Sequence, residues 1–169
     1  MSNIGKLKLH MPSFLKIVKK DFDLNFYTLC FIGKLGKISI NLPIDFRLIV
    51  DNNSLVLDSD NLVMWGTTRN LIHQAIIGVT TGHSNKLELV GIGYKLSFNN
   101  NKISLYVGQS HEINIEVPKQ IQINVLNATT LTATSLSYPL LTNFLHSIRL
   151  IKPASLDHYK GKGILVKKV

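Results

Sequence analysis

The chain has 169 residues, of which 45% are hydrophobic, a content that is typical of globular proteins and excludes global disorder. Its 19 Lys and Arg outnumber 10 Asp and Glu, and the net charge of +9 predicts an acidic partner, most often nucleic acid or an anionic membrane. The single cysteine, Cys30, excludes a disulfide framework and any cysteine-based zinc or iron–sulfur site.

The first twenty residues are basic: they hold five lysines and neither an acidic residue nor an arginine. They lack the apolar core and the small-residue cleavage site of a secretory signal, and an organelle transit peptide is normally rich in arginine. We therefore expect residues 1–29 to form a basic N-terminal arm.

A first domain is expected over residues 30–82, with strands followed by one helix. The apolar runs at 46–50 and 54–57 predict two of the strands. Asp and Asn residues between these runs suit a hairpin turn, because both tolerate positive φ.

The helix of this domain is expected over residues 67–81. Thr67 or Thr68 would cap its start, and Gly82 stands where a left-handed residue commonly follows a helix. The apolar positions repeat at helical spacing, so they predict one buried face: Leu71, Ile72, Ala75, Ile76 and Val79.

A second domain is expected over residues 83–169. Its apolar runs at 120–126 and 129–134 predict strands, and a helix is expected over 138–150 with Pro139 in its first turn. The apolar face of that helix has the spacing of the first helix: Leu140, Leu141, Phe144, Leu145 and Ile148.

The two apolar faces coincide at a constant offset of 69 residues, and the strand sequence at 37–40 is echoed at 102–105. Periodicity alone matches often by chance, but the added strand echo favours an internal duplication. We predict an α+β fold of two tandem similar domains, each an antiparallel sheet with one main helix packed on one face.

Neither a membrane span nor a metal site is expected. The uncharged stretch 120–148 is long enough to cross a bilayer, but polar and apolar residues alternate in it, as in a strand with one wet face. The six histidines are scattered, and none pairs with another ligand at metal-binding spacing.

Two glycine motifs resemble nucleotide-binding loops but lack essential parts. Gly91 and Gly93 follow a strand without the third glycine or the helix of a dinucleotide site, so they favour a bulge or a close backbone approach. Lys162 is followed by Gly163 rather than by the Ser or Thr of a P-loop.

No catalytic constellation is present, so we expect no enzyme activity, no cofactor and no small-molecule substrate.

The last 21 residues contain six of the 19 Lys and Arg residues and a single acidic residue, Asp157. Such a concentration is expected where a protein neutralises phosphates of nucleic acid. Within it, Tyr159 is suited to stacking on a base, and the Gly and Lys residues at 160–163 are suited to following a phosphate backbone. A solvated basic tail is the alternative interpretation.

Three stretches in this order resemble the universal family of the sixth protein of the large ribosomal subunit. They are the opening of the first helix at 66–69 with Gly78–Gly82, the strand Lys86–Lys95, and the C-terminal segment Asp157–Ile164. The resemblance covers roughly residues 30 to 166.

This resemblance implies two sheet-plus-helix domains and a non-enzymatic role in the large subunit, holding ribosomal RNA near the region where translation factors dock, beside neighbouring ribosomal proteins. The C-terminal domain would make the principal RNA contact. The expected RNA-binding residues are Arg149, Lys152, Tyr159, Lys160, Gly161, Lys162, Gly163, Lys167 and Lys168, with Arg69 and Lys95 as further candidates.

Other interpretations remain open at this point. A peripheral membrane protein would need a basic amphipathic helix, and the second predicted helix has no Lys or Arg before Arg149. A free RNA-binding protein acting outside the ribosome is the alternative function. The abundance of Lys, Asn and Ile reflects AT-rich codons and favours a mitochondrial ribosome, with the cytoplasm of an AT-rich bacterium as the alternative.

Overall fold

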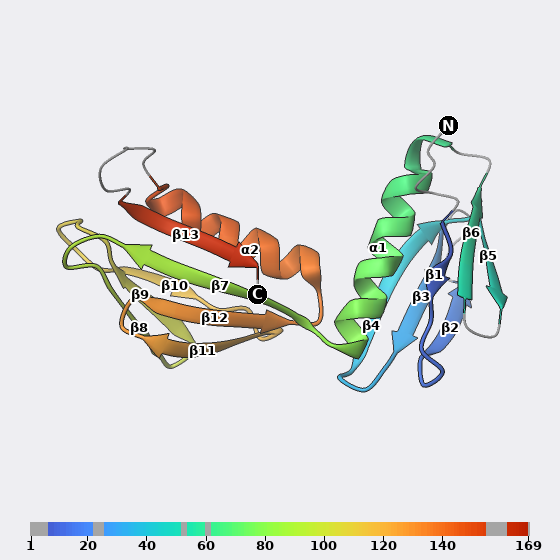
Figure 1. The fold of residues 1–169 in the computed structure, drawn as a ribbon, viewed down its shortest axis with the longest axis horizontal. Coiled ribbons are helices and arrows are strands. Elements are labelled where there is room, and N and C mark those ends of the chain that lie inside the picture. Colours follow the sequence, from blue (N-terminus) through green and yellow to red (C-terminus); the bar gives the residue numbers. More distant parts are fainter. Residues whose placement is uncertain (1–6, 22–25, 52–53, 60–61, 155–161, 169) are drawn as a thin grey trace. The chain divides into compact units, whose positions relative to one another are not determined.

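The computed structural model describes residues 7–21, 26–51, 54–59, 62–154 and 162–168 (Figure 1). The chain divides into two compact units, Met1–Gly82 and His83–Val169, and each is described by itself. Both combine one helix with antiparallel strands, so the predicted α+β class is confirmed. Within these described residues, no helix is both long and apolar enough to cross a membrane.

The first unit contains two three-stranded antiparallel sheets where the prediction has one. In the first sheet β3 lies between β2 and β4, and in the second β6 lies between β1 and β5. The elements are β1 (Leu9–His10), β2 (Lys16–Asp21), β3 (Phe26–Ile32), β4 (Lys37–Pro43), β5 (Phe46–Asp51), β6 (Ser54–Ser59) and α1 (Leu62–Thr80).

The predicted N-terminal arm is wrong for the described part of residues 1–29. This segment supplies β1, β2 and most of β3, and Leu9 and Leu15 are buried in the core of the first unit. The lysines conceal the strand, because only one face of β2 turns inward: Ile17 packs against the core from that face, whereas Lys16 lies on the other.

Helix α1 begins at Leu62, five residues before the predicted start, so neither Thr67 nor Thr68 is its N-cap. Trp65 explains the difference: it is buried, and its indole N–H donates to the Leu57 carbonyl at 2.8 Å. Thr68, one turn further on, is only 4% exposed and shares this inward face. Packing of Trp65 thus moves the start of the helix toward the N-terminus, away from the capping residues Thr67 and Thr68.

The burial predicted for α1 is confirmed at four positions and wrong at Leu71, which is 37% exposed. Ile72, Ala75, Ile76 and Val79 lie in the core, because the stripe that begins at Trp65 is centred away from Leu71. Gly82 ends the helix as expected: its φ is +79° and its N–H donates to the Ile77 carbonyl.

The second unit has a four-stranded sheet in the order β11-β12-β7-β13 and a three-stranded sheet in the order β10-β9-β8. Its elements are β7 (His83–Val90), β8 (Lys95–Asn99), β9 (Lys102–Tyr106), β10 (Ile113–Glu116), β11 (Ile121–Asn127), β12 (Thr130–Ser135), α2 (Tyr138–Ile151) and β13 (Gly163–Lys168).

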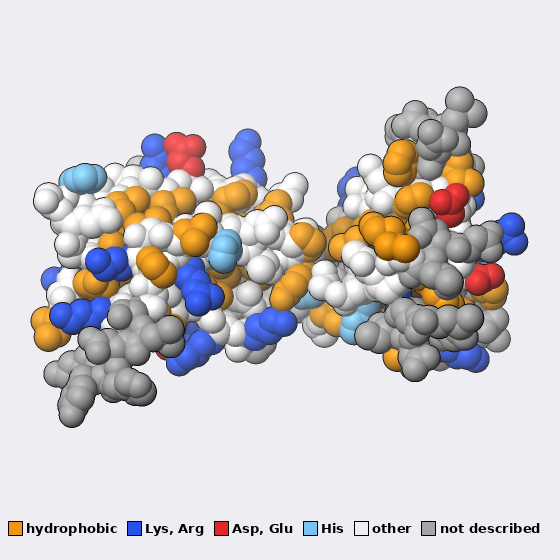
Figure 2. All heavy atoms as spheres, turned by 90° about the horizontal axis from the view of Figure 1, so that it is seen from above, with side chains coloured by type: hydrophobic (Ala, Val, Ile, Leu, Met, Phe, Trp, Pro, Cys, Tyr) orange, Lys and Arg blue, Asp and Glu red, His pale blue; other side chains and the backbone are white. Residues whose placement is uncertain are grey.

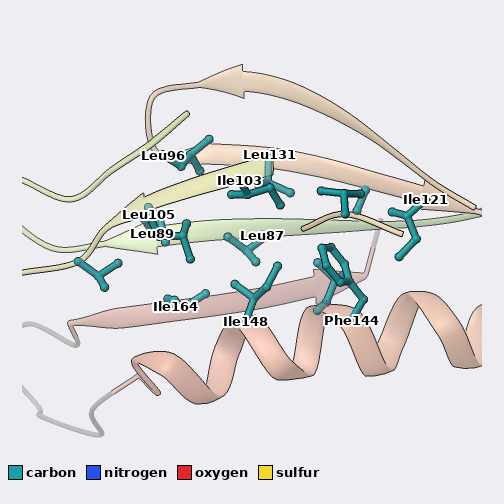
Figure 3. Close-up of a cluster of buried hydrophobic side chains, with 14 of the residues drawn as sticks. Leu87, Leu89, Leu96, Ile103, Leu105, Ile121, Leu131, Phe144, Ile148 and Ile164 are labelled. Atoms are coloured by element: carbon teal, nitrogen blue, oxygen red, sulfur yellow. The ribbon is translucent and has the colours of Figure 1, made fainter. Parts of the chain in front are cut away.

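One core joins α2 to both sheets of the second unit. Figure 3 shows Phe144 and Ile148 directed from the helix toward Leu87 of β7 and the other apolar strand residues. Of the predicted apolar face, Leu140 is only partly buried, and the other four residues are buried: Leu141, Phe144, Leu145 and Ile148. They stand 69 residues after the four buried positions of α1, so the helix part of the repeat is confirmed.

The predicted strand echo is wrong. By their positions in the sheets, β1, β6 and β5 of the first unit correspond to β7, β12 and β11 of the second. In the same way, β2-β3-β4 corresponds to β8-β9-β10. The segment 37–40 lies in β4, an edge strand, whereas 102–105 lies in β9, the middle strand of its sheet. The counterpart of β4 is β10, and strand β13 has no counterpart among the described residues of the first unit.

Candidate nucleic-acid interface

The chain leaving α2 meets the chain entering β13 at one point. The Ile164 N–H donates to the carbonyl of Lys152 at 2.9 Å, and Pro153 forms a parallel bridge with Ile164. We call this contact of residues 152–154 with residues 163–164 the loop neck. It brings together two segments of the basic C-terminal region that the sequence separates.

Gly163 makes the neck possible. Its φ is +151°, and an added Cβ would stand 2.4 Å from the Cα of Ala154 and 2.6 Å from its nitrogen. Real Cβ atoms do not approach other heavy atoms this closely, so a side chain at residue 163 would push the two segments apart. The glycine requirement therefore has a cause inside the protein.

Three predicted cations lie at or next to the neck, and all three are exposed. Arg149 occupies the last turn of α2, Lys152 follows the helix, and Lys162 precedes Gly163. Figure 2 shows Lys and Arg side chains on the side of the second unit seen from above. The predicted residues Tyr159, Lys160 and Gly161 lie outside the described residues.

Lys167 and Lys168 lie on opposite faces of β13. The Nζ of Lys167 is 2.8 Å from the Oε2 of Glu88, on the face that turns away from the core. The Nζ of Lys168 lies 5.2 Å from the ring centroid of Tyr138, the first residue of α2. These two predicted residues therefore do not belong to one surface.

The carboxylate of Glu88 lies between two lysines. Lys167 and Lys86 both donate to it, the latter at 2.7 Å, and these bonds lower the pKa of Glu88 to about 2. Sequence reasoning missed Lys86 and Glu88. The signal was available, because polar and apolar residues alternate along β7 and the polar ones must share a face.

Around Glu88 the outer face of the four-stranded sheet is polar. The strand register places hydroxyl and amide side chains beside the two lysines, in rows that cross β11, β12 and β7: Gln122, Asn124, Thr132, Thr134 and Ser84. Hydroxyl and amide groups can donate and accept hydrogen bonds, so they suit the sugars and phosphates of RNA.

The two further candidates differ in position. Lys95 opens β8 just after the turn that follows Val90, and Val90 pairs with Gly163, so Lys95 lies toward the same end of the unit as the neck. Arg69 belongs to α1 of the first unit, where its Nε donates to the Leu7 carbonyl at 3.1 Å. That contact gives Arg69 a structural role.

The glycine motif at residues 91–93 lies within the described residues. Gly91 and Gly93 form a turn, and an added Cβ at Gly91 would stand 2.7 Å from the Tyr94 ring, which is the close approach expected there. Over the whole described part of the chain, no three His, Cys, Asp or Glu side chains gather as metal ligands would.

Comparison with known proteins identifies relatives over nearly the whole chain. No protein-family model matches the sequence. Large ribosomal subunit protein uL6 of Malacoplasma penetrans is 32% identical over 97% of this chain and 89% of its own length. Protein uL6m of Reclinomonas americana is 32% identical over 97% and 92%, and uL6c of Porphyra purpurea is 36% identical over 97% and 90%.

Proposed function

The chain belongs to the uL6 family of large ribosomal subunit proteins, and from this membership we propose that it binds the large-subunit ribosomal RNA through its second unit. Members of this family are structural ribosomal proteins, and the chain is not an enzyme. Its partners are accordingly the RNA and the neighbouring proteins of the large subunit.

The loop neck is the observation that carries the RNA-binding proposal. It gathers Arg149, Lys152 and Lys162 at one end of the second unit, where all three side chains are exposed. None of these three pairs with an acidic side chain in the structure as described, so their charges are available to phosphates.

The outer face of the four-stranded sheet offers further basic residues in the same unit. Lys86 and Lys167 together outweigh Glu88, and the surrounding hydroxyl and amide groups add neutral hydrogen-bonding capacity. At either lysine, an approaching phosphate would replace the Glu88 carboxylate as the partner of the ammonium group. We therefore assign the neck as the main contact and the outer face of the four-stranded sheet as the secondary one.

The salt dependence of RNA binding tests the proposal. With about four to six phosphate contacts, a plot of log K against log salt should have a slope of roughly −3 to −5, because each neutralised phosphate releases a counterion. Filter binding or fluorescence titration with large-subunit RNA measures it. A slope near zero would contradict an electrostatic contact.

Two finer assignments follow from the family and, for the compartment, also from the composition. We propose that the RNA contact lies near the region where translation factors dock, and a photoreactive residue in place of Lys162 would identify the nucleotides beside it. We also propose a mitochondrial ribosome, which the relative in Reclinomonas americana supports; plastid and bacterial relatives make other compartments the competing outcome. Immunodetection in purified mitochondria tests this.

A further inference from the structure

The β2-β3-β4 sheet of the first unit has one face that the core does not cover. Tyr27, Leu29 and Phe31 of β3 point into the core and are nearly inaccessible. Side chains alternate along a strand, so Thr28, Cys30 and Ile32 point to the other side. We call this side the outer face of the β2-β3-β4 sheet.

Exposed lysines flank one end of this face. In the strand register Lys16 of β2 and Lys37 of β4 lie on either side of Ile32, so all three side chains share a row. Both lysines are exposed, and Ile32 is 41% exposed. With strands about 4.8 Å apart, the two lysine Cα atoms are roughly 10 Å apart.

A third lysine lies beside this row. Lys34 belongs to the turn that joins Ile32 to Lys37, and its Nζ stands 4.5 Å from the ring centroid of Phe14, two residues before Lys16. The aromatic ring holds the Lys34 ammonium near the same end of the sheet. Three positive charges therefore gather within a short distance.

The described side chains of the outer face provide no carboxylate to balance these charges. The next rows contribute Val18, Cys30 and Ser39, and then Thr28, whose hydroxyl donates to the Oδ1 of Asn41 at 2.9 Å. In the four-stranded sheet of the second unit, by contrast, Lys86 and Lys167 both pair with Glu88. Like charges without a counter-ion repel one another, so the first unit's face favours an anionic partner.

We propose that the outer face of the β2-β3-β4 sheet is a second RNA-binding surface, which binds the phosphate backbone of the large-subunit ribosomal RNA through Lys16, Lys34 and Lys37. Charge complementarity selects this occupant. Ser39, Thr28 and Asn41 supply neutral hydrogen-bonding groups, and the apolar residues Val18 and Ile32 stand in different rows. This inference rests on the proposed function, because it assumes that the chain meets that RNA.

Cys30 provides a built-in reporter of the face. It is the only cysteine of the chain, and it lies half-buried in the middle strand beside Val18 and Ser39. Its alkylation rate by N-ethylmaleimide is measured in the full chain, free and saturated with large-subunit RNA. We expect alkylation to slow at least several-fold when RNA covers the face.

Charge variants supply the second readout. Lys16→Gln and Lys37→Gln should each reduce the steepness of the salt slope by about 0.7–0.9, and the double variant by the sum. Lys19→Gln is the matched control. It removes the same charge from the same strand, but Lys19 lies on the opposite face, with its Nζ 4.6 Å from the Tyr27 ring centroid.

The outcomes separate this inference from the proposed function. If the unsubstituted chain fails to bind the RNA, the proposed function fails and this inference falls with it. If the chain binds, but Cys30 reacts at an unchanged rate and the Lys16 and Lys37 variants behave like Lys19→Gln, only the second surface is refuted. Protection of Cys30 in the assembled subunit but not by RNA alone would assign the face to a protein neighbour and likewise overturn the proposal.

Discussion

Gly163 lies directly against the backbone of Ala154, and this contact joins the end of α2 to the start of β13. The contact determines where the exposed cations of the neck stand relative to one another. It also makes residue 163 intolerant of any side chain, because the obstructing atoms belong to the backbone and cannot rotate away.

We predict that Gly163→Ala destabilises the second unit by about 1–3 kcal/mol through steric overlap and backbone strain. Gly93→Ala is the control, since Gly93 has a φ of +78° but no atom within 4 Å of an added Cβ. Urea denaturation should show the smaller loss for Gly93→Ala. Equal losses would mean that strain alone, and not the contact with Ala154, explains the glycine.

The Glu88 ion pairs predict a pH dependence of stability. The pKa of Glu88 is lowered from 4.5 to about 2, chiefly by the hydrogen bond from Lys167 and then by that from Lys86. The folded state therefore holds its proton less tightly than the unfolded chain. The resulting stabilisation is complete above pH 4.5 and is lost as the pH falls toward about 2.

Glu88→Gln should accordingly unfold with a weaker acid dependence than the unsubstituted chain. Denaturation midpoints measured at several pH values between neutrality and pH 3 provide the comparison. If both proteins lose stability in parallel over this range, Lys86 and Lys167 do not stabilise the Glu88 carboxylate in solution.

We predict that Phe144→Ala costs about 3–5 kcal/mol of unfolding free energy, because it removes a large side chain from the core shared by α2 and both sheets. Leu150→Ala truncates an apolar residue of the same helix that is 63% exposed, and it should change stability by about 0.5 kcal/mol or less. Chemical denaturation followed by circular dichroism measures both. Similar losses would argue against the inward orientation of Phe144.

At the neck, Lys162→Ala should reduce the steepness of the salt slope of RNA binding by about one unit, since a lysine on a phosphate acts as one point charge. Lys102→Ala is the control, because Lys102 pairs with Glu116 at 3.1 Å in the other sheet of the same unit. A change of the same size in both variants would remove Lys162 from the interface.

Gly161→Val is expected to impair incorporation into the large subunit more than Lys162→Ala, although it changes no charge. Gly161 lies outside the described residues, so this prediction follows from the sequence: a β-branched side chain would stand where a glycine lets the backbone approach RNA. Quantification of the chain in purified subunits compares the two variants. Normal incorporation of Gly161→Val would favour a solvated tail.

The elements with strong periodic patterns could be predicted from the sequence. Helix α2 and its inward residues Leu141, Phe144, Leu145 and Ile148 follow from spacing, and Pro139 lies in the first turn as expected. Asn100 and Asn101 have positive φ between β8 and β9, as the run of asparagines indicates.

Other features depend on contacts that are distant in the sequence. The hydrogen bond from Trp65 to Leu57 stabilises the added N-terminal residues of α1. The burial of Leu9 stabilises a strand in the segment that the sequence predicts as a basic arm. The similar sequences at 37–40 and 102–105 occupy different sheet positions, because local composition does not specify strand pairing.

The candidate site was predictable in composition but not in geometry. The charge concentration identifies the C-terminal region, yet the opposite faces of Lys167 and Lys168 follow only from the pairing of β13 with β7. The role of Gly163 likewise depends on Ala154. A sequence motif contains only neighbouring residues, so it cannot predict a close approach between two separate segments.

Sedimentation of ribosomal particles tests the central claim most directly. Cells producing the chain with a small epitope tag are lysed in low salt, and the lysate is separated on a sucrose gradient with and without a high-salt wash. We predict that the chain is recovered with large-subunit RNA, near one copy per particle, and that Lys152→Ala/Lys162→Ala particles lose it at lower salt. Recovery of the chain in the soluble fractions, with intact large subunits that lack it, would contradict the account and favour an RNA-binding protein that acts outside the ribosome.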